Sequence, residues 1–272
     1  MKSTAKKLLE VAEFLSALLY SAILILRRDG TRRTIVYYHS VQKKDINRFE
    51  KQMEYLAKNC HVVNVSEIGE AQADARYTVA ITFDDAFVSV LENAVPVLKR
   101  HGLSAGIFVP TGNLGQSPRW EMPENCPDKN EIVMNRDQLA ELADDNISIF
   151  SHSVSHPIFT LVDNDMLKNE LEQSKNTLEE ILGYEIVGIS YPHGAHDDRV
   201  CRLVMEVGYK LGFTTEPTMV DNNADPLKIG RFSVSPSDSL LKFRLKVNGA
   251  YQITKYLRCL KAKAFRLMSR IR

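Results

Sequence analysis

Two short polar stretches, each directly after an apolar run, carry residue types that suit metal-assisted chemistry. The run ending at Phe83 leads into the adjacent carboxylates Asp84 and Asp85, and a second apolar run leads into His152 and His156. Two imidazoles and one carboxylate supply the three protein ligands of an open catalytic metal site, whose fourth position takes water. The pattern predicts one bound divalent metal, with zinc the best match and iron, cobalt or nickel as substitutes.

Asp84 and Asp85 cannot play the same part on an extended chain, because adjacent side chains of a strand point in opposite directions. One can therefore donate an oxygen to the metal while the other accepts a proton. A helix N-cap is the ordinary alternative for such a pair. The H-x-x-x-H spacing alone is weak evidence, and the serines and proline around His152 and His156 favour a loop there.

Strand-like and helix-like runs alternate from about residue 34 onward. Strands are predicted at 34–41, 60–65, 77–85, 104–110, 146–151, 185–192, 209–215 and 227–234, and helices at 47–59, 89–101, 135–143 and 163–182. Repeated units of this kind imply a mostly parallel sheet. The predicted fold class is α/β, a distorted (β/α)7-8 TIM-like barrel with flanking N- and C-terminal helices. Chemistry is then expected at the C-terminal ends of the strands, under a long loop at 111–134.

Together these motifs resemble those of the polysaccharide deacetylase family, the NodB homology domain, over roughly residues 34–236. T-F-D-D is similar to the family's first motif, which implies that Asp84 is the general base and Asp85 a metal ligand. S-H-S-V-S-H-P is similar to the second motif, which implies that His152 and His156 are the other two ligands.

The family's third motif is only partly matched. Its common form is R-x-P-Y, and the aligned residues here are Ser190-Tyr191-Pro192-His193. The resemblance implies that the His193 backbone N–H helps to form an oxyanion hole, while the arginine that usually orients the base is missing. Arg231, at the end of the predicted strand 227–234, is the candidate replacement. A rim arginine in an ordinary ion pair is the alternative.

The family's late L-x-H motif, which supplies the general acid, is absent after residue 196. Instead the first predicted strand ends in Y-Y-H-S-V, as in the circularly permuted branch that includes poly-N-acetylglucosamine deacetylases. Because the first and last strands of a closed barrel are neighbours, His39 can enter the site from this end. His39 is the predicted general acid, with His193 as its rival and a purely structural histidine as the alternative.

The resemblance implies a metal-dependent hydrolase that removes N-acetyl from an N-acetylhexosamine in a polysaccharide or lipid-linked glycan. Two other functions stay open. One is a deformylase of a polyprenyl-linked formamido sugar, and the other is a catalytically weak carbohydrate-binding pseudoenzyme, motivated by Ser190 where arginine is expected. The sequence contains neither G-x-S-x-G nor G-x-x-x-x-G-K, which argues against a serine hydrolase or a kinase.

A net charge of +1 conceals a strong asymmetry along the 272 residues. Residues 1–33 carry +4, residues 34–238 carry −13, and residues 239–272 carry +10 with no acidic residue. An acidic body is poorly suited to nucleic acid, whereas basic ends suit an anionic membrane surface. The chain is therefore divided into a membrane-associating helix (1–33), a catalytic barrel (34–238) and a basic amphipathic C-terminal helix (239–272). A solvated tail, or a helix packed on the barrel, is the alternative for the last part.

The N-terminal helix at 8–26 is apolar but contains Glu10 and Glu13. Its uninterrupted apolar run, 14–26, is shorter than the ~20 residues that span a bilayer. Arginines follow this run where a signal peptide would have a cleavage site. An uncleaved membrane-associated helix is predicted, with a signal anchor or a buried helix as alternatives. Positive flanks and four widely spaced cysteines favour a peripheral protein of the cytoplasmic face, with export left open.

Overall fold

The computed structural model describes residues 2–26, 32–70, 77–142, 146–257 and 260. Its strands are β1 (Arg32–Tyr38), β2 (His61–Val62), β3 (Tyr77–Phe83), β4 (Ala105–Val109), β5 (Ile147–Ser151), β6 (Gly188–Ser190), β7 (Leu211–Phe213) and β8 (Phe232–Ser233). Its α-helices are α1 (Lys2–Leu26), α2 (Ile46–Asn59), α3 (Val95–His101), α4 (Arg136–Leu142), α5 (Asn164–Leu182), α6 (Asp198–Glu206) and α7 (Leu240–Val247).

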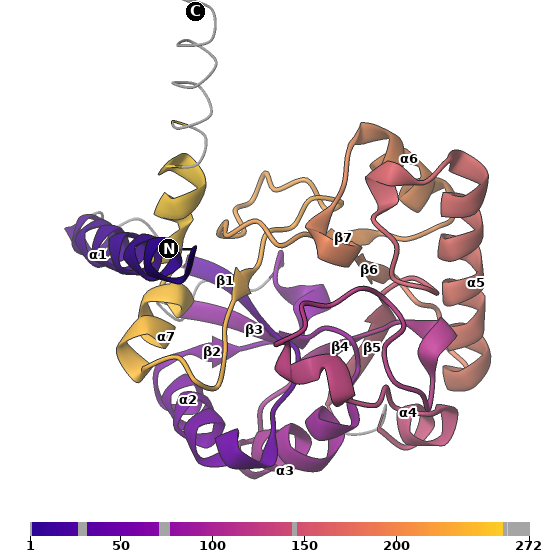
Figure 1. The fold of residues 1–272 in the computed structure, drawn as a ribbon, viewed down its shortest axis with the longest axis horizontal. Coiled ribbons are helices and arrows are strands. Elements are labelled where there is room, and N and C mark those ends of the chain that lie inside the picture. Colours follow the sequence, from indigo (N-terminus) through magenta and orange to yellow (C-terminus); the bar gives the residue numbers. More distant parts are fainter. Residues whose placement is uncertain (1, 27–31, 71–76, 143–145, 258–259, 261–272) are drawn as a thin grey trace, which may run out of the picture.

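The strands form one parallel sheet in the order β7-β6-β5-β4-β3-β1-β8, with β2 also paired to β3. Val36 of β1 is in register with Ile81 of β3 on one side and with Phe232 of β8 on the other. A parallel bridge between Phe213 and Ile229 links β7 to the segment that precedes β8. The predicted α/β, TIM-like barrel fold is confirmed as a curled parallel sheet with helices around it (Figure 1).

Burial on both faces explains why the central strands are continuous apolar runs. Six of the seven residues of β3 are buried, and α2 covers the sheet with Phe49, Met53 and Leu56. Parallel sheets have apolar side chains on both faces, and their crossover helices cover these side chains. The helices α5 and α6 lie at one end of the molecule, whereas α1 and α7 lie at the other (Figure 1).

Local sequence signals account for several helix ends. Asn135 and Gln138 exchange hydrogen bonds between side chain and backbone N–H at the start of α4, the reciprocal arrangement of a capping box. Gly102 and Gly183 end α3 and α5 in the left-handed conformation that glycine adopts at little cost. The helix predicted at 89–101 begins as a π-helical turn, Val90–Ala94, before α3.

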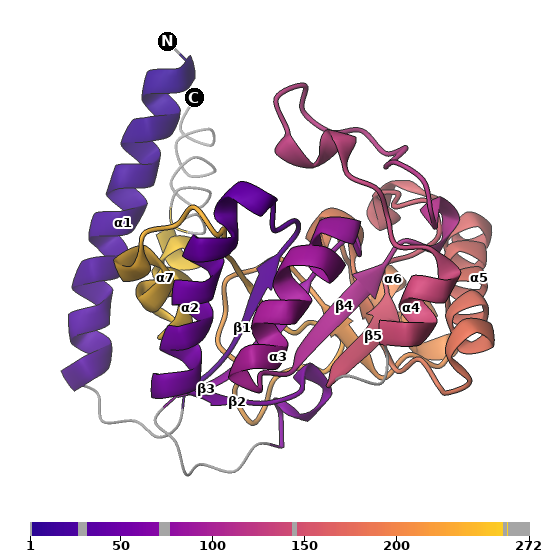
Figure 2. The same ribbon diagram turned by 90° about the horizontal axis from the view of Figure 1, so that it is seen from below.

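The loop 111–134 rises above the C-terminal ends of the strands, as its predicted position over the site requires (Figure 2). The basic C-terminal helix is described only at its beginning, since residues 258–259 and 261–272 lie outside the described residues. The division of the chain into three parts stays a prediction.

Candidate active site

The predicted site residues follow the C-terminal ends of neighbouring strands. Asp84 and Asp85 follow β3, and His152 and His156 follow β5. His39 comes directly after β1, which pairs with β3. Because all these strands are parallel, their C-terminal ends meet at one rim of the sheet and bring the side chains together.

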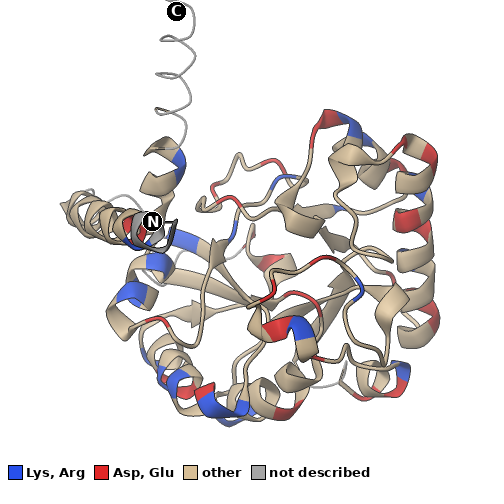
Figure 3. Ribbon diagram, viewed as in Figure 1, with Lys and Arg blue, Asp and Glu red and all other residues tan. Residues whose placement is uncertain are grey.

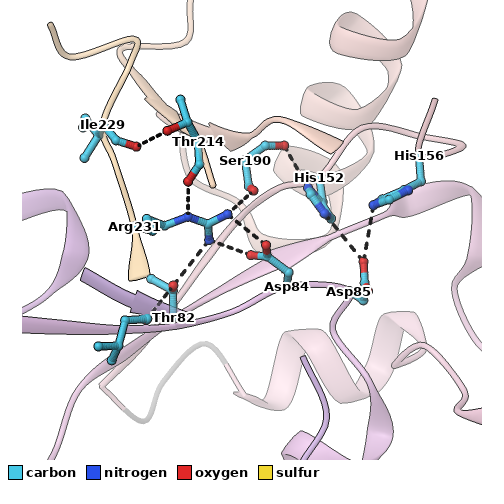
Figure 4. A network of polar contacts seen from close by, with 10 residues as sticks. Thr82, Asp84, Asp85, His152, His156, Ser190, Thr214, Ile229 and Arg231 are labelled. Carbon is cyan, nitrogen blue, oxygen red and sulfur yellow. Dashed lines mark hydrogen bonds and ion pairs between the residues drawn. The ribbon is translucent and has the colours of Figure 1, made fainter. Parts of the chain in front are cut away.

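Asp85, His152 and His156 form a buried cluster whose ligand atoms lie within 4.8 Å of one another. Asp85 Oδ1 is 3.6 Å from His152 Nε2 and 3.7 Å from His156 Nε2 (Figure 4). Tetrahedral zinc, with metal–ligand bonds of about 2.0–2.2 Å, separates its ligand atoms by about 3.3–3.5 Å. The three side chains therefore have the chemistry and nearly the spacing of a metal site.

The hydrogen bonds and the burial of these three side chains favour binding of a cation. His152 Nδ1 lies 2.8 Å from the Ser190 carbonyl oxygen, which can only accept, so Nδ1 donates and Nε2 keeps its lone pair. Burial lowers the pKa of His152 to about 4 and that of His156 to about 2, so both rings are neutral at pH 7. Burial raises the pKa of Asp85 to about 7, and its Oδ1 has no hydrogen-bond partner among the described residues. A bound cation would supply the partner that Asp85 Oδ1 lacks.

The loop that carries both histidines is held by Glu170 of α5, which is itself buried. The Glu170 carboxylate accepts hydrogen bonds from Val154 N (2.8 Å), Ser155 N (2.9 Å) and Ser155 Oγ (2.6 Å). From within the loop, Ser153 Oγ accepts from His156 N at 3.0 Å. The three bonds to one carboxylate fix the backbone between the two predicted ligands.

Sequence reasoning missed Glu170, although a signal for it exists. Glu170 shares the buried side of α5 with Leu167, Leu171 and Ser174, where the helical spacing favours apolar or small residues. An acidic residue on that side of a helix needs a buried partner, and the polar loop after β5 provides it.

Asp84 has an environment opposite to that of Asp85. Arg231 donates to both of its oxygens, from Nη1 to Oδ1 at 2.7 Å and from Nη2 to Oδ2 at 2.9 Å. Burial alone would raise the pKa of Asp84, but the charge and hydrogen bonds of Arg231 lower it to about 2. The carboxylate is therefore ionised and fixed in orientation.

Arg231 is itself fully buried and satisfied from several strands. Its Nη2 donates to Ser190 Oγ at 2.7 Å, and its Nε donates to the Thr214 carbonyl at 3.1 Å (Figure 4). The guanidinium lies over the Tyr37 ring, 4.6 Å from its centroid. The structure thus places Arg231 against Asp84, next to the serine that stands where the family motif has arginine.

A cavity of about 420 Å³ lies over these groups and is lined by both candidate proton donors, His39 and His193. The loop 111–134 contributes Trp120, whose ring stacks on His156 with centroids 4.7 Å apart. Asp84, Asp85, Glu121 and Asp128 are the acidic residues of this lining, which among the described residues includes no lysine or arginine. The cavity is within the size range of small-ligand pockets.

Left-handed backbone conformations concentrate at the site. Of the six non-glycine residues with positive φ in the described part of the chain, five belong to it: Asp85, Ala86, Ser153, His156 and His193. Such conformations cost roughly 1–2 kcal/mol each and persist where the surroundings hold them. They turn the chain after β3, β5 and β6, so that side chains next to one another in sequence can enter the cavity.

The fold and these motifs define the class of protein. The sequence model of the polysaccharide deacetylase family matches residues 71–212, and this chain belongs to that family. The chain is 26% identical over 215 residues to YxkH of Bacillus subtilis, whose name places it with the polysaccharide deacetylases; the match covers 75% of this chain and 72% of YxkH.

A second relative has a more specific name. The poly-beta-1,6-N-acetyl-D-glucosamine N-deacetylase of Staphylococcus aureus is 24% identical over 229 residues, 77% of this chain and 76% of the relative. Among solved structures, a Streptococcus pyogenes deacetylase, PplD, in complex with acetate is 22% identical with a TM-score of 0.68 and covers 80% of this chain and 99% of PplD. IcaB from Ammonifex degensii is also 22% identical, with a TM-score of 0.67, and covers 82% and 97% of the two chains. At this identity the structures support the fold alone.

Proposed function

We propose that this protein is a metal-dependent hydrolase that removes the acetyl group from an N-acetylhexosamine of a polysaccharide or lipid-linked glycan. One observation carries the proposal: in one cavity, a buried Asp85 whose Oδ1 has no hydrogen-bond partner among the described residues lies beside two neutral histidines and next to an ionised Asp84 that is bound by Arg231. Metal-assisted amide hydrolysis uses an electrophilic metal and a base at adjacent positions. The name of the S. aureus relative supports an N-acetylated sugar as the substrate.

Asp85, His152 and His156 would hold the metal, and their mixed nitrogen and oxygen donors suit zinc. A bound divalent cation supplies Lewis acidity, which activates water and polarises the amide carbonyl. Glu170 keeps the loop of the two histidines in place, and Trp120 covers the outer face of His156.

Asp84 would act as the base. Arg231 keeps its carboxylate ionised at pH 7, so it can orient a water and accept its proton. The same ion pair weakens Asp84 as a base, since it lowers the pKa to about 2. Orientation of the attacking water is therefore as much its task as removal of the proton.

Two further groups would complete the reaction. Water adds to the carbonyl carbon, the C–N bond breaks, and the nitrogen leaves as an amine after it receives a proton. His39 lines the cavity and would donate this proton. His193 also lines the cavity, with a positive φ, and its backbone N–H would stabilise the oxyanion.

The test is hydrolysis of small N-acylated amino sugars by the purified protein loaded with zinc. N-acetylglucosamine oligomers should release acetate and free amine in equal amounts, and Asp84→Asn should release neither at a comparable rate. Formate release from N-formyl sugars with no acetate release would instead identify a deformylase. Sugar binding without either product would identify a pseudoenzyme.

A further inference from the structure

Helix α1 is attached to the barrel along one side only. Ala17, Ser21 and Leu24 are buried, and α1 lies beside α7 and the following 3-10 turn, Ala250–Gln252 (Figure 2). Asn248 Nδ2 donates to Ser21 Oγ at 3.1 Å, and Arg32 donates to the Leu24 carbonyl. These contacts hold α1 parallel to the flank of the molecule.

The other side of α1 is apolar and exposed to solvent. Leu19 is 72% exposed and Leu26 is 82% exposed. The outer face of α1 is defined by Leu8, Val11, Leu15, Leu19, Ile23 and Leu26. At 100° per residue these six positions fall within an arc of about 120°.

The two glutamates of α1 lie on its inner side, opposite to the exposed apolar side chains. Glu10 and Glu13, which are the charged residues between Leu8 and Leu26, fall on the same half of the helix as the buried Ala17. Figure 3 shows α1 without charge along most of its length. A helix of a water-soluble protein normally directs its polar side outward, so the outer face of α1 is built for an apolar environment.

We propose that the outer face of α1 lies in the interfacial region of an anionic lipid bilayer while its inner side stays packed on the barrel. The charge of the neighbouring elements favours a lipid partner. In the sequence, residues 239–272 carry ten basic and no acidic residues, whereas residues 34–238 carry −13; the described beginning of this basic segment, α7 with Lys242, Arg244 and Lys246, lies beside α1. Anionic lipid is therefore attracted to the basic C-terminal segment and repelled by the acidic body of the chain.

A lipid interface suits this geometry better than a membrane-spanning arrangement does. Residues Lys7–Leu26 are long and apolar enough to cross a membrane, with a mean hydropathy of 1.9. To span, however, α1 would have to separate from α7, lose the bond between Ser21 and Asn248, and expose buried side chains of the barrel. An in-plane helix keeps all of these contacts and still removes the outer leucines from water.

Vesicle binding by the full chain tests the proposal. The purified protein should co-sediment with vesicles of phosphatidylcholine and phosphatidylglycerol (3:1) and bind less to pure phosphatidylcholine, with weaker binding at high salt. Leu15→Glu with Leu19→Glu should lower the partition coefficient at least about tenfold, since two apolar contacts are lost.

The matched control places two glutamates at exposed apolar positions elsewhere, Leu161→Glu with Met205→Glu. It should bind vesicles like the unmodified protein, and thermal melting should show that both double variants are folded. Equal binding by both double variants would overturn the proposal. So would a dimer in light scattering that Leu15→Glu with Leu19→Glu dissociates, because a second copy would then cover the face. Resistance of the bound protein to alkaline carbonate would indicate a spanning helix and also overturn it.

Discussion

Asp84 and Asp85 are consecutive, chemically identical and both buried, yet the structure gives them opposite surroundings. Arg231 binds both oxygens of Asp84, whereas Oδ1 of Asp85 lies 3.6 and 3.7 Å from two neutral imidazoles and has no hydrogen bond among the described residues (Figure 4). The pKa values separate accordingly, to about 2 for Asp84 and about 7 for Asp85. A positive φ at Asp85 produces this separation, because it turns the chain between the two side chains. Because Arg231 already binds Asp84, Asp85 is the carboxylate that can accept a cation.

The largest effect should come from removing the imidazoles that face Asp85. His152→Ala with His156→Ala should abolish stoichiometric metal binding and lower turnover by at least about four orders of magnitude, since both electrophile and activated water are lost. Elemental analysis and amine release measure the two effects. His61→Ala, at an exposed position, is the control and should change neither. Full metal content in the double variant would show that the ion binds elsewhere.

Asp84→Asn tests the proposed role of Asp84 as the base. It should keep the metal and lower turnover about 10²- to 10⁴-fold, the range for loss of a general base. Metal content and turnover on the same sample separate the two roles. Loss of metal together with activity would mean that Asp84, despite its ion pair with Arg231, is a ligand.

A substitution of His39 tests the proposed proton donor. His39→Ala should fold, keep its metal and lose about two orders of magnitude in turnover, with a change in the pH profile on the side where the acid titrates. His193→Ala is the matched variant on the other wall of the cavity. Nearly full activity in His39→Ala, with a large loss in His193→Ala, would transfer the role of acid to His193.

A smaller effect is expected from Glu170, which acts only through the loop after β5. Glu170→Gln should weaken metal binding about 10- to 100-fold, because an amide cannot accept all three hydrogen bonds of the carboxylate. A competition titration with a chelator measures this affinity. Glu172→Gln, at an exposed position of the same helix, should leave it unchanged.

The smallest effect concerns Asp238, a second buried carboxylate that is paired as Asp84 is. Lys246 and Lys242 lie 2.5 and 2.8 Å from its oxygens, and although burial opposes the shift, these cations lower its pKa. A lowered pKa stabilises the fold at pH values above the unfolded pKa of ~4, and this stabilisation is lost as pH falls through the folded pKa.

Asp238→Asn should therefore lower the free energy of unfolding by about 1–2 kcal/mol at pH 7 and flatten its dependence on pH below ~4. Denaturant melts at several pH values measure both quantities. Glu54→Gln, which removes an exposed partner of Lys58, is the control and should have little effect. If the free energy of unfolding of Asp238→Asn depended on pH below ~4 as that of the unmodified protein does, pairing with the lysines would not stabilise this carboxylate.

Much of this architecture could be predicted from the sequence, because the strands are apolar runs that end in polar residues. Asp84, Asp85, His152 and His156 were placed at one rim for that reason, and the alternating pattern predicted the confirmed fold. Arg231 was a candidate through its position at the end of a late predicted strand, outside the matched residues 71–212. The sequence left open whether Arg231 or solvent would face Asp84, since that depends on how β8 pairs with β1.

Other features depend on tertiary contacts that no local pattern encodes. The left-handed turns at Ala86 and Ser153 occur at residues without a strong preference for positive φ. Glu170 occupies a helix in which glutamate is common, and only its buried neighbours distinguish it. For α1, composition predicted an apolar helix, but its direction along the flank follows from contacts with α7, more than 200 residues away in the chain.

With the proposed metal, the five left-handed residues of the site would also connect metal supply with protein abundance. Their conformations oppose folding, whereas a cation that binds the folded chain and not the unfolded chain shifts the equilibrium back toward the native state. A cell that synthesises this protein while metal is scarce would hold a larger unfolded fraction, which proteases remove. The amount of protein present would then follow the amount of metal available, without any dedicated regulator.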